Sequence, residues 1–240
     1  MKGFIRKYQK IESGPVVEIC AYNSPMIRMT RGSRSAPTTP EQNARNLSGI
    51  IRKVTRLLNT NYACEDYYVT LTYSDSALAF LNKGMPVGLS EDEQSAYVYE
   101  QARKELERFI RRCRYASKAI GVDFRFIGVT SDRDHLDTVD RRVHHHLVVN
   151  GEAIEIIKQS WRNGYTHTTH LYNQEDYRPL AAYMLKQTRR IKGKACYKAS
   201  RNHKQPIITT ALSLDAWDIP PKIKAEMSRT SYAQYYLKLV

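Results

Sequence analysis

Three consecutive histidines interrupt an apolar, β-branched segment near the middle of the chain. The segment Arg142–Asn150 reads RVHHHLVVN, a composition that predicts a β-strand closed by the turn at Gly151. Side chains alternate across a strand, so His144 and His146 share one face, while His145 lies among the apolar residues of the other. Two parallel imidazoles can chelate one metal ion. We therefore expect His144 and His146 to be metal ligands and His145 to be a packing residue.

A third protein ligand would have to come from the end of a neighbouring strand. The side chains within reach follow the strand predicted over residues 124–130, and they are Ser131, Asp132 and Asp134. A carboxylate is a better partner for a divalent cation than a hydroxyl. Asp132 is therefore the predicted third ligand.

A tyrosine and a lysine, Tyr183 and Lys186, lie three residues apart in a segment whose apolar spacing predicts a helix. This spacing places both side chains on one helix face. A tyrosine hydroxyl, with a pKa of about 10, is a poor nucleophile at neutral pH, but a nearby cation favours the phenolate. A bound metal would also polarise a phosphoryl oxygen. These parts predict a tyrosine that attacks a phosphodiester; a structural tyrosine is the alternative, because Tyr183 is one of 17 tyrosines.

Elements that could position these residues follow from the capping and periodicity signals along the chain. The signals predict an α+β fold with a largely antiparallel sheet and helices packed against it. A loop is expected between the first predicted strand and the second predicted helix. The expected helices cover residues 40–59, a long segment beginning at the capping box Ser90 to Glu93, 152–161 and a segment following Asp176; the expected strands cover residues 67–73, 124–130, 142–150, 165–172 and 207–212.

The expected domain organisation is one main domain with two flanking segments. Residues 1–38 contain strand-like pieces and a loop rich in Arg, Gly, Ser and Pro, which indicates a basic N-terminal arm. Residues 39–212 carry the regular pattern and form the expected main domain. Pro220-Pro221 breaks the pattern within residues 213–240, the expected C-terminal tail.

Basic residues outnumber acidic ones by 38 to 24, which gives a net charge of +14. Such an excess indicates a polyanionic partner, with nucleic acid as the first candidate. The densest basic stretch has aromatic or small residues between its cations, a pattern that suits a nucleic-acid groove better than a solvated surface. The residues predicted to contact DNA are Arg189, Arg190, Lys192, Lys194, Lys198, Arg201 and Lys204.

Several other classes of protein are disfavoured by the sequence. No apolar run approaches the roughly 20 residues needed to cross a bilayer, and the N-terminus lacks the apolar core of a signal peptide, so we expect a cytoplasmic protein. There is no Gly-x-x-x-x-Gly-Lys-Ser/Thr phosphate loop, so nothing indicates an ATPase or helicase module. The four cysteines form no Cys-x-x-Cys pair, which argues against a zinc knuckle.

Three segments resemble, in the same order, the motifs of rolling-circle replication initiators of the HUH endonuclease superfamily. Val69–Tyr73 is similar to the first-strand motif, His144–Val149 to the metal strand and Tyr183–Lys186 to the catalytic Tyr-x-x-Lys. Trp161–Gly164 and Ser200–Pro206 also resemble segments of the short, helicase-free Rep proteins of phages and plasmids.

This resemblance implies an HUH endonuclease fold with an RRM-like or ferredoxin-like sheet. It implies that Tyr183 nicks one strand at an origin and stays joined to the 5′ phosphate, which leaves a 3′ hydroxyl for a polymerase. His144 and His146 would hold Mg²⁺ or Mn²⁺, and Lys186 would support the transition-state charge. The implied partners are origin or single-stranded DNA and, in a bacterial host cell, a helicase and a DNA polymerase. Ser131 stands where the family has its acidic third ligand, and no second tyrosine lies four residues from Tyr183.

Two other functions fit parts of the same pattern. A transposase or relaxase of the same superfamily would share the chemistry. A non-catalytic nucleic-acid-binding protein would instead use an RRM-like sheet that displays Tyr67, Tyr68 and Phe126 for base stacking. A covalent protein–DNA adduct separates the enzymes from the binding protein.

Overall fold

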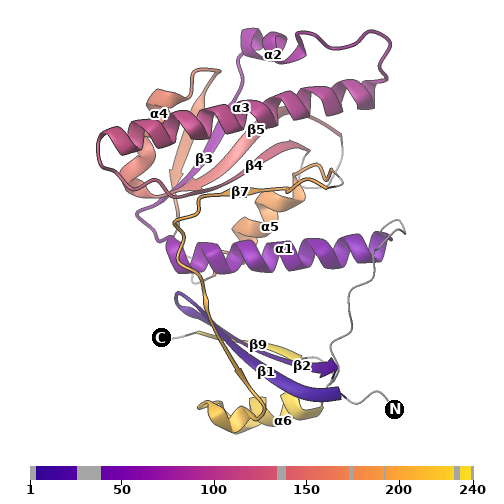
Figure 1. The fold of residues 1–240 in the computed structure, drawn as a ribbon, viewed down its shortest axis with the longest axis vertical. Helices are drawn as coiled ribbons and strands as arrows, with labels where there is room; N and C mark the ends of the chain where they lie inside the picture. Colours follow the sequence, from indigo (N-terminus) through magenta and orange to yellow (C-terminus); the bar gives the residue numbers. More distant parts are fainter. Residues whose placement is uncertain are drawn as a thin grey trace. The chain divides into compact units, whose positions relative to one another are not determined.

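The computed structural model describes residues 4–25, 39–133, 139–172, 176–191, 193–229 and 233–238. The chain divides into two compact units, which are described separately (Figure 1). The terminal unit, as we call it, comprises Met1–Asn61, Glu175–Tyr177 and Lys204–Val240. The central unit comprises Tyr62–Gln174 and Arg178–His203.

The terminal unit contains a four-stranded antiparallel sheet in the order β8-β1-β2-β9. A hairpin joins β1 to β2, and the two outer strands come from the C-terminal part of the chain. Its elements are β1 (Phe4–Ser13), β2 (Val16–Pro25), α1 (Pro40–Asn61), β8 (Ile207–Ala211), the 3₁₀ helix η2 (Leu214–Ala216), α6 (Pro221–Arg229) and β9 (Ala233–Lys238).

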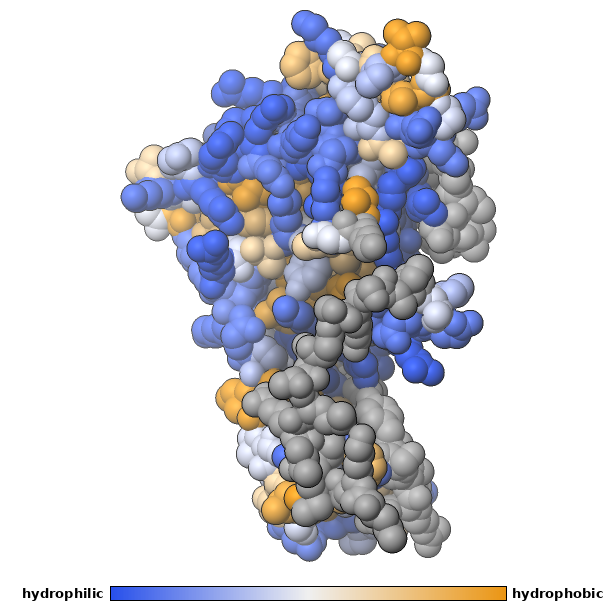
Figure 2. All heavy atoms as spheres, turned by 45° about the vertical axis from the view of Figure 1, so that its right-hand side comes forward, coloured by the Kyte–Doolittle hydropathy of each residue, from blue (hydrophilic) through white to orange (hydrophobic). Residues whose placement is uncertain are grey.

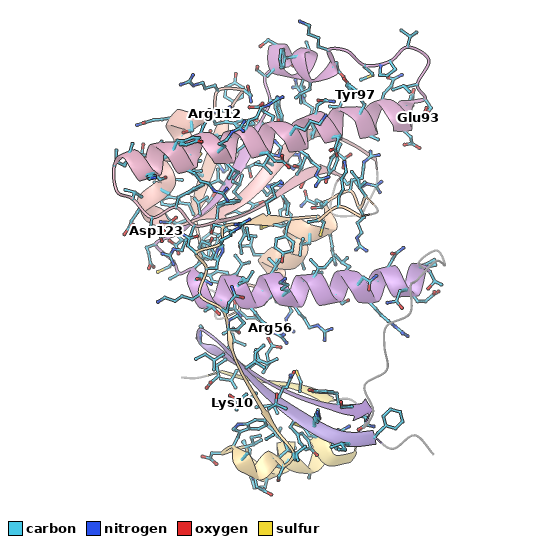
Figure 3. The ribbon with its side chains drawn as sticks, in the orientation of Figure 1. Lys10, Arg56, Glu93, Tyr97, Arg112 and Asp123 are labelled. Atoms are coloured by element: carbon cyan, nitrogen blue, oxygen red, sulfur yellow. The ribbon has the colours of Figure 1, made fainter. Side chains whose placement is uncertain are left out.

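Gly14 makes the tight turn of this hairpin possible. Its φ angle is +57°, a conformation that residues with a Cβ atom rarely adopt. A Cβ atom at this position would also overlap the backbone oxygen of Asn59, at the end of α1. Close to this turn, the buried carboxylate of Glu18 accepts two hydrogen bonds from the Arg56 guanidinium, at 2.9 and 2.7 Å. Figure 3 shows Arg56 on α1. The turn and the ion pair together tie the hairpin to the helix.

The boundaries of the two units differ from the expected domain organisation. Residues 1–38 were expected to be a basic arm and residues 213–240 a tail. In the structure, β1 and β2 from the first segment form one sheet with β9 from the last and with β8. They share an apolar core whose buried members include Val17, Ile19 and Met227. The rest of the expected arm, residues 26–38, lies outside the described residues.

The central unit contains a five-stranded antiparallel sheet in the order β6-β3-β5-β4-β7. This architecture confirms the predicted α+β class with a largely antiparallel sheet. Its strands are β3 (Tyr67–Thr72), β4 (Phe126–Arg133), β5 (Val139–Val149), β6 (Thr166–His170) and β7 (Lys198–Ala199). Its helices are α2 (Asp75–Asn82), α3 (Glu91–Ala119), the 3₁₀ helix η1 (Gly151–Ala153), α4 (Ile154–Ser160) and α5 (Arg178–Lys186).

Helices cover the two faces of the central sheet unequally. Figure 1 shows the long helix α3 and the short α4 on one face and α5 on the other. The main hydrophobic core lies between the sheet and α3, where Phe109, Phe126 and Leu147 are almost fully buried. On the face of the central unit that Figure 2 presents, most exposed residues are hydrophilic and the hydrophobic ones form small, separate patches. None of the described helices combines the length and apolar character needed to span a membrane.

The predicted capping box at the start of α3 is confirmed. Ser90 Oγ accepts a hydrogen bond from the Glu93 backbone N–H, and the Glu93 carboxylate accepts one from the Ser90 backbone N–H. Figure 3 shows Glu93 in the first turn of this helix. The segment between β3 and α3 was expected to be a loop, but it contains α2. Ser74, expected to close a strand, is also the N-cap of this helix, because its side chain accepts from the Ala77 N–H.

Replacing Gly14 with alanine should lower the free energy of unfolding by about 2 kcal/mol. The added Cβ atom would meet the Asn59 oxygen and would hold a left-handed conformation. Gly49, inside α1 of the same unit, is a matched control because nothing lies within 4 Å of its Cβ position. Gly49→Ala should stabilise the protein by roughly 0.5–1 kcal/mol. Urea denaturation measures both changes, and equal effects of the two substitutions would contradict this account of the turn.

Candidate active site on the histidine strand

The histidine strand β5 is the middle strand of the central sheet, hydrogen-bonded to β3 on one side and to β4 on the other. In this register His144 lies opposite Thr72 and Ser131, and His146 lies opposite Thr70 and Val129. Residues directly opposite each other in an antiparallel pair point to the same face. One face of the sheet therefore presents both histidines among hydroxyl groups.

His145 points to the other face, as predicted. It is fully buried against α3 and α4, where Tyr73 Oη lies 2.7 Å from its Nε2 and Thr130 Oγ1 lies 3.1 Å from its Nδ1. Burial lowers its pKa to about 3, so the ring is neutral. A neutral imidazole with a partner at each nitrogen is satisfied in the core, which makes His145 a structural residue.

The imidazoles of His144 and His146 converge on one point. Their Nε2 atoms are 2.9 Å apart. The Nδ1–H of His144 donates to the Arg142 carbonyl at 2.8 Å, which leaves its Nε2 lone pair directed at His146. Burial lowers the pKa of His146 to about 3, so this ring is also neutral. Two ligand atoms at right angles about an ion with bonds of about 2.1 Å lie about 3 Å apart, so the pair has the spacing of two metal ligands.

Tyr68 and Thr70 hold the other nitrogen of His146. Tyr68 Oη lies 2.5 Å from His146 Nδ1, and Thr70 Oγ1 lies 3.2 Å from the same atom. Gln187, buried at the end of α5, also hydrogen-bonds to the His146 side chain. A ligand histidine typically has such a partner on its second nitrogen, which fixes the tautomer and the ring orientation.

Tyr183 lies beside this histidine pair, although it is far from it in the sequence. Helix α5 lies across the open face of the sheet and brings the Tyr183 ring within 5.6 Å of the His146 ring and 6.4 Å of the Tyr68 ring, between centroids. Met184 and Leu185 are buried and anchor the helix. Tyr183 itself is 46% exposed, which leaves it open to a ligand as large as DNA. Lys186, one turn further along α5, is also exposed.

The prediction of Asp132 as the third ligand disagrees with the structure. Asp132 is turned toward α3, where its Oδ2 accepts from Arg189 Nε at 2.8 Å, and Arg189 in turn donates to Ser95 of that helix. This is the face opposite to His144 and His146. Strand alternation explains the difference, because Ser131, one residue earlier, pairs with His144 and so shares its face. Asp134, the other carboxylate considered, lies outside the described residues.

Ser131 is the oxygen closest to the predicted ligand position. It is fully buried, and its Oγ atom has no hydrogen-bond partner among the described residues. A buried hydroxyl without a partner is costly, so an additional ligand or water molecule is expected there. The part of the chain that the structure describes contains no group of three or more His, Cys, Asp or Glu able to hold a metal ion. The protein donors available on this face are therefore the two imidazoles and neighbouring hydroxyls.

The basic residues predicted to contact DNA do not form one surface. Arg189 is largely buried by its ion pair with Asp132, so its predicted DNA contact is not supported. Lys194 pairs with Glu100 of α3 at 2.7 Å. Lys192 lies outside the described residues. The remaining members are Arg190, which is exposed, Lys198 and Arg201, which line a groove beside α3, and Lys204, which belongs to the terminal unit.

The Trp161–Gly164 segment positions the end of β3 opposite His144. Trp161 Nε1–H donates to the Thr72 carbonyl at 3.0 Å, and the Asn163 carbonyl accepts from the Ser74 N–H at 2.8 Å. A Cβ atom on Gly164 would overlap the Thr72 oxygen, so only glycine fits there. This segment, noted for its resemblance to short Rep proteins, is therefore a structural support.

Sequence reasoning missed Tyr68, Thr70 and Gln187 as parts of the site. For Tyr68 and Thr70 the signal was present, because alternation along the predicted β3 strand places them on one face. Only the register between β3 and β5 shows that this face is the histidine face. Gln187 had a weaker signal, four residues beyond Tyr183 on the same helix face.

A family model of replication-associated proteins, of the type described as ORF2, matches residues 66–188. The chain belongs to this family. The matched segment begins just before β3, ends just after α5 and contains every residue of the site described above. This family confirms the predicted resemblance to Rep-type replication initiators. No curated protein and no solved structure matches the chain.

The Asp132–Arg189 pair should contribute to stability as a coupled unit. Asp132→Asn and Arg189→Met should each lower the free energy of unfolding by about 2 to 3 kcal/mol, because each leaves a buried charged group with a weaker partner. In a double-mutant cycle the coupling should exceed about 1 kcal/mol. The exposed pair Glu155–Lys158, at 2.8 Å, is the control and should show much weaker coupling. Additive effects at Asp132 and Arg189 would show that the ion pair is unimportant.

Proposed function

We propose that this protein nicks one strand of DNA at a replication origin, with Tyr183 as the nucleophile. The observation that supports this most strongly is the position of Tyr183, half exposed and 5.6 Å from the His146 ring between centroids. The sequence places these two residues on separate elements, and the fold brings them to one face of the sheet. Membership of a replication-associated family makes DNA the natural substrate.

The proposed reaction is a transfer between two esters of the same phosphate. Tyr183 Oη attacks the phosphorus, a new P–O bond forms to the tyrosine, and the bond from phosphorus to the 3′ oxygen breaks. The tyrosine hydroxyl loses its proton and the departing 3′ oxygen gains one, so no other reactant is needed. The products are a 5′-phosphotyrosine link and a free 3′ hydroxyl. Because one phosphodiester replaces another, the same site can also rejoin strands.

His144 and His146 would hold Mg²⁺ or Mn²⁺. Their spacing, their neutral state and the unpartnered Ser131 hydroxyl fit a bound cation with further positions open to water and phosphate oxygens. The cation would polarise the phosphoryl oxygen that is being attacked. Mg²⁺ prefers oxygen ligands, so two nitrogen donors without a carboxylate favour Mn²⁺.

The remaining residues of the site position the reacting groups. Tyr68 and Thr70 orient His146, and Lys186 supplies a positive charge on the helix face that carries Tyr183. In the proposed reaction sequence, a host helicase unwinds the DNA and a host polymerase extends the 3′ hydroxyl.

The non-catalytic alternative is less well supported. It requires Tyr67, Tyr68 and Phe126 on one open face, but Phe126 is 1% exposed in the core beneath α3 and Tyr67 packs against the same core. Of these three aromatic residues, Tyr68 alone lies on the histidine face. A transposase or relaxase would share the proposed chemistry and differ in its DNA substrate.

Tyr183→Phe should abolish covalent attachment to DNA. The assay incubates the protein and Mn²⁺ with a labelled pool of single-stranded oligonucleotides and looks for an adduct that survives denaturing electrophoresis. Tyr115, a tyrosine of α3 that is 70% exposed, provides the matched control, and Tyr115→Phe should form the adduct normally. An adduct that persists in the Tyr183 variant, or none from the wild type with any divalent metal, would refute the proposed nucleophile.

Tyr68→Phe should weaken Mn²⁺ binding roughly tenfold, because it removes the hydroxyl that orients His146. Tyr67 is the neighbouring residue on β3 and packs on the other face, so Tyr67→Phe should leave the affinity unchanged. The concentration of free Mn²⁺, followed by electron paramagnetic resonance during a titration, gives both affinities. Equal affinities for the two variants would exclude an orienting role for Tyr68.

A further inference from the structure

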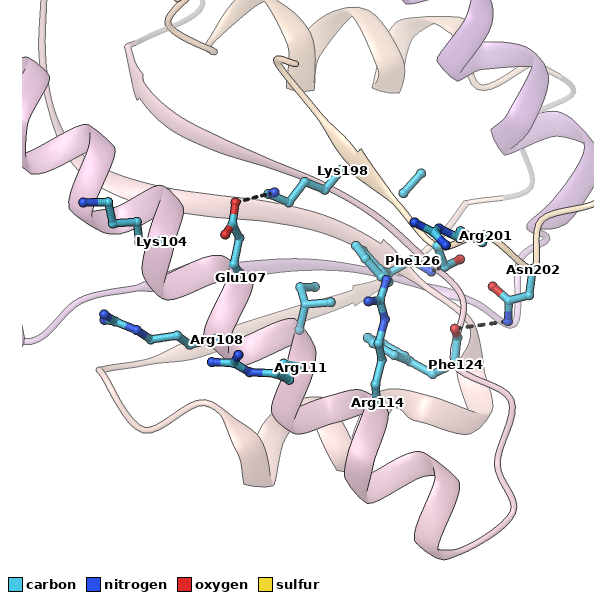
Figure 4. Close-up of a pocket in the computed structure, with 13 residues that line it drawn as sticks. Lys104, Glu107, Arg108, Arg111, Arg114, Phe124, Phe126, Lys198, Arg201 and Asn202 are labelled. Atoms are coloured by element: carbon cyan, nitrogen blue, oxygen red, sulfur yellow. Dashed lines mark hydrogen bonds and ion pairs between the residues drawn. The ribbon is translucent and has the colours of Figure 1, made fainter. Parts of the chain in front are cut away.

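A basic groove of about 1040 Å³ lies beside α3 in the central unit, away from the histidines. One wall is α3, and the other is formed by β7 and the residues that follow it (Figure 4). Its floor includes Phe126, which belongs to the core face of the sheet. The groove therefore opens on the face opposite to Tyr183. Its lining cations are Lys104, Arg108, Arg111, Arg114, Lys198 and Arg201, and its one acidic residue is Glu107.

Several of these cations are not neutralised within the protein. Lys198 pairs with Glu107 at 2.6 Å, and Arg108 contacts Glu105 at 3.3 Å. Lys104, Arg111 and Arg201 are exposed and form no ion pair with any residue that the structure describes. Figure 4 shows Lys104 and Arg111 on the α3 wall and Arg201 on the other. An anion in this groove would therefore meet positive charge from both sides.

The spacing along α3 suits a row of phosphates. Lys104, Arg108, Arg111 and Arg114 follow one another at intervals of three or four residues, so they span roughly 15 Å of helix. One strand of a DNA duplex carries a phosphate about every 3.4 Å along its axis, which places about four phosphates over this length. Arginine, the commonest cation here, binds phosphate oxygens through two parallel hydrogen bonds.

The aromatic residues of the groove do not offer a stacking surface. Phe124 and Phe126 are 7% and 1% exposed, and they pack against each other with ring centroids 5.1 Å apart. Arg114 covers the Phe126 ring at 5.6 Å from its centroid. Binding of single strands generally depends on bases stacked on exposed rings. A groove with cations but without open rings favours the phosphate backbone of a duplex, in which the bases are already paired.

We propose that this groove binds the sugar–phosphate backbone of duplex DNA, independently of its sequence. The inference rests on the DNA substrate of the proposed function but not on the tyrosine chemistry. Such a contact would retain the protein on duplex DNA while the opposite face of the sheet acts on a separated strand. It adds cations of α3 to Lys198 and Arg201, the two predicted DNA contacts that line the groove.

The test is binding of the full-length protein to a short labelled duplex of arbitrary sequence, followed by fluorescence anisotropy between 50 and 200 mM salt. The triple variant Lys104→Gln, Arg111→Gln, Arg201→Gln should bind the duplex roughly 10- to 100-fold more weakly, and the slope of log K against log salt should fall by about 3. The charge-matched control is Arg45→Gln, Lys83→Gln, Lys118→Gln, whose side chains are exposed and lie outside the groove. This control should lose much less affinity. Thermal unfolding checks that both variants are folded.

Three results would overturn the proposal. The groove variant could bind the duplex as tightly as the wild type, or the groove and control variants could lose affinity equally, which would indicate a general charge effect. The loss could also fall on a single strand or on an acidic peptide rather than on the duplex. Tyr183→Phe should retain duplex binding in the same assay, so a failure of the proposed nicking chemistry would not affect this result.

Discussion

The alternation of side chains along β5 is the constraint on which the site depends. As the middle strand, β5 is held in register by β3 on one side and β4 on the other. A slip of one residue would bring His144 and His146 into the core and turn His145 outward. The core side resists this, because His145 is enclosed and hydrogen-bonded to Tyr73 and Thr130. The residue that takes no part in the chemistry therefore fixes the orientation of the two that do.

The C-terminal end of the histidine strand is held by a second set of polar contacts. The Asp66 carboxylate accepts from the backbone N–H groups of Ala63 and Gly151, and a Cβ atom on Gly151 would lie 2.7 Å from the Glu65 oxygen. Asn150 accepts from the Arg125 N–H through its side-chain oxygen and donates to the Asp123 carbonyl. Buried polar groups satisfied on all sides favour one arrangement of the backbone over its alternatives. Both ends of the strand pairings around the histidines are thus fixed by short-range contacts that no motif contains.

How far the sequence could be interpreted depended on whether a pattern was local. Strand alternation separated His145 from its neighbours, and capping signals located α1 and α3, because both depend only on nearby residues. The third ligand required knowledge of which residues of β4 lie opposite His144, and a choice by chemical type selected Asp132 where the register selects Ser131. The terminal unit was missed for a similar reason. Its sheet joins strands from the two ends of the chain, and such a pairing leaves no local signal.

Charge gave a less specific guide than pattern, because an ionic group can serve the fold or a ligand. Arg189 and Arg201 come from the same basic stretch, yet one is buried against Asp132 and the other is exposed in a groove. Burial makes the difference: a cation that has lost its water needs a fixed counter-ion, and it cannot also bind phosphate. Cations that remain hydrated and unpaired keep that capacity. In this family member the sheet thus separates two kinds of positive site, with fixed charges supporting the fold beneath α3 and exposed charges lining the groove beside it.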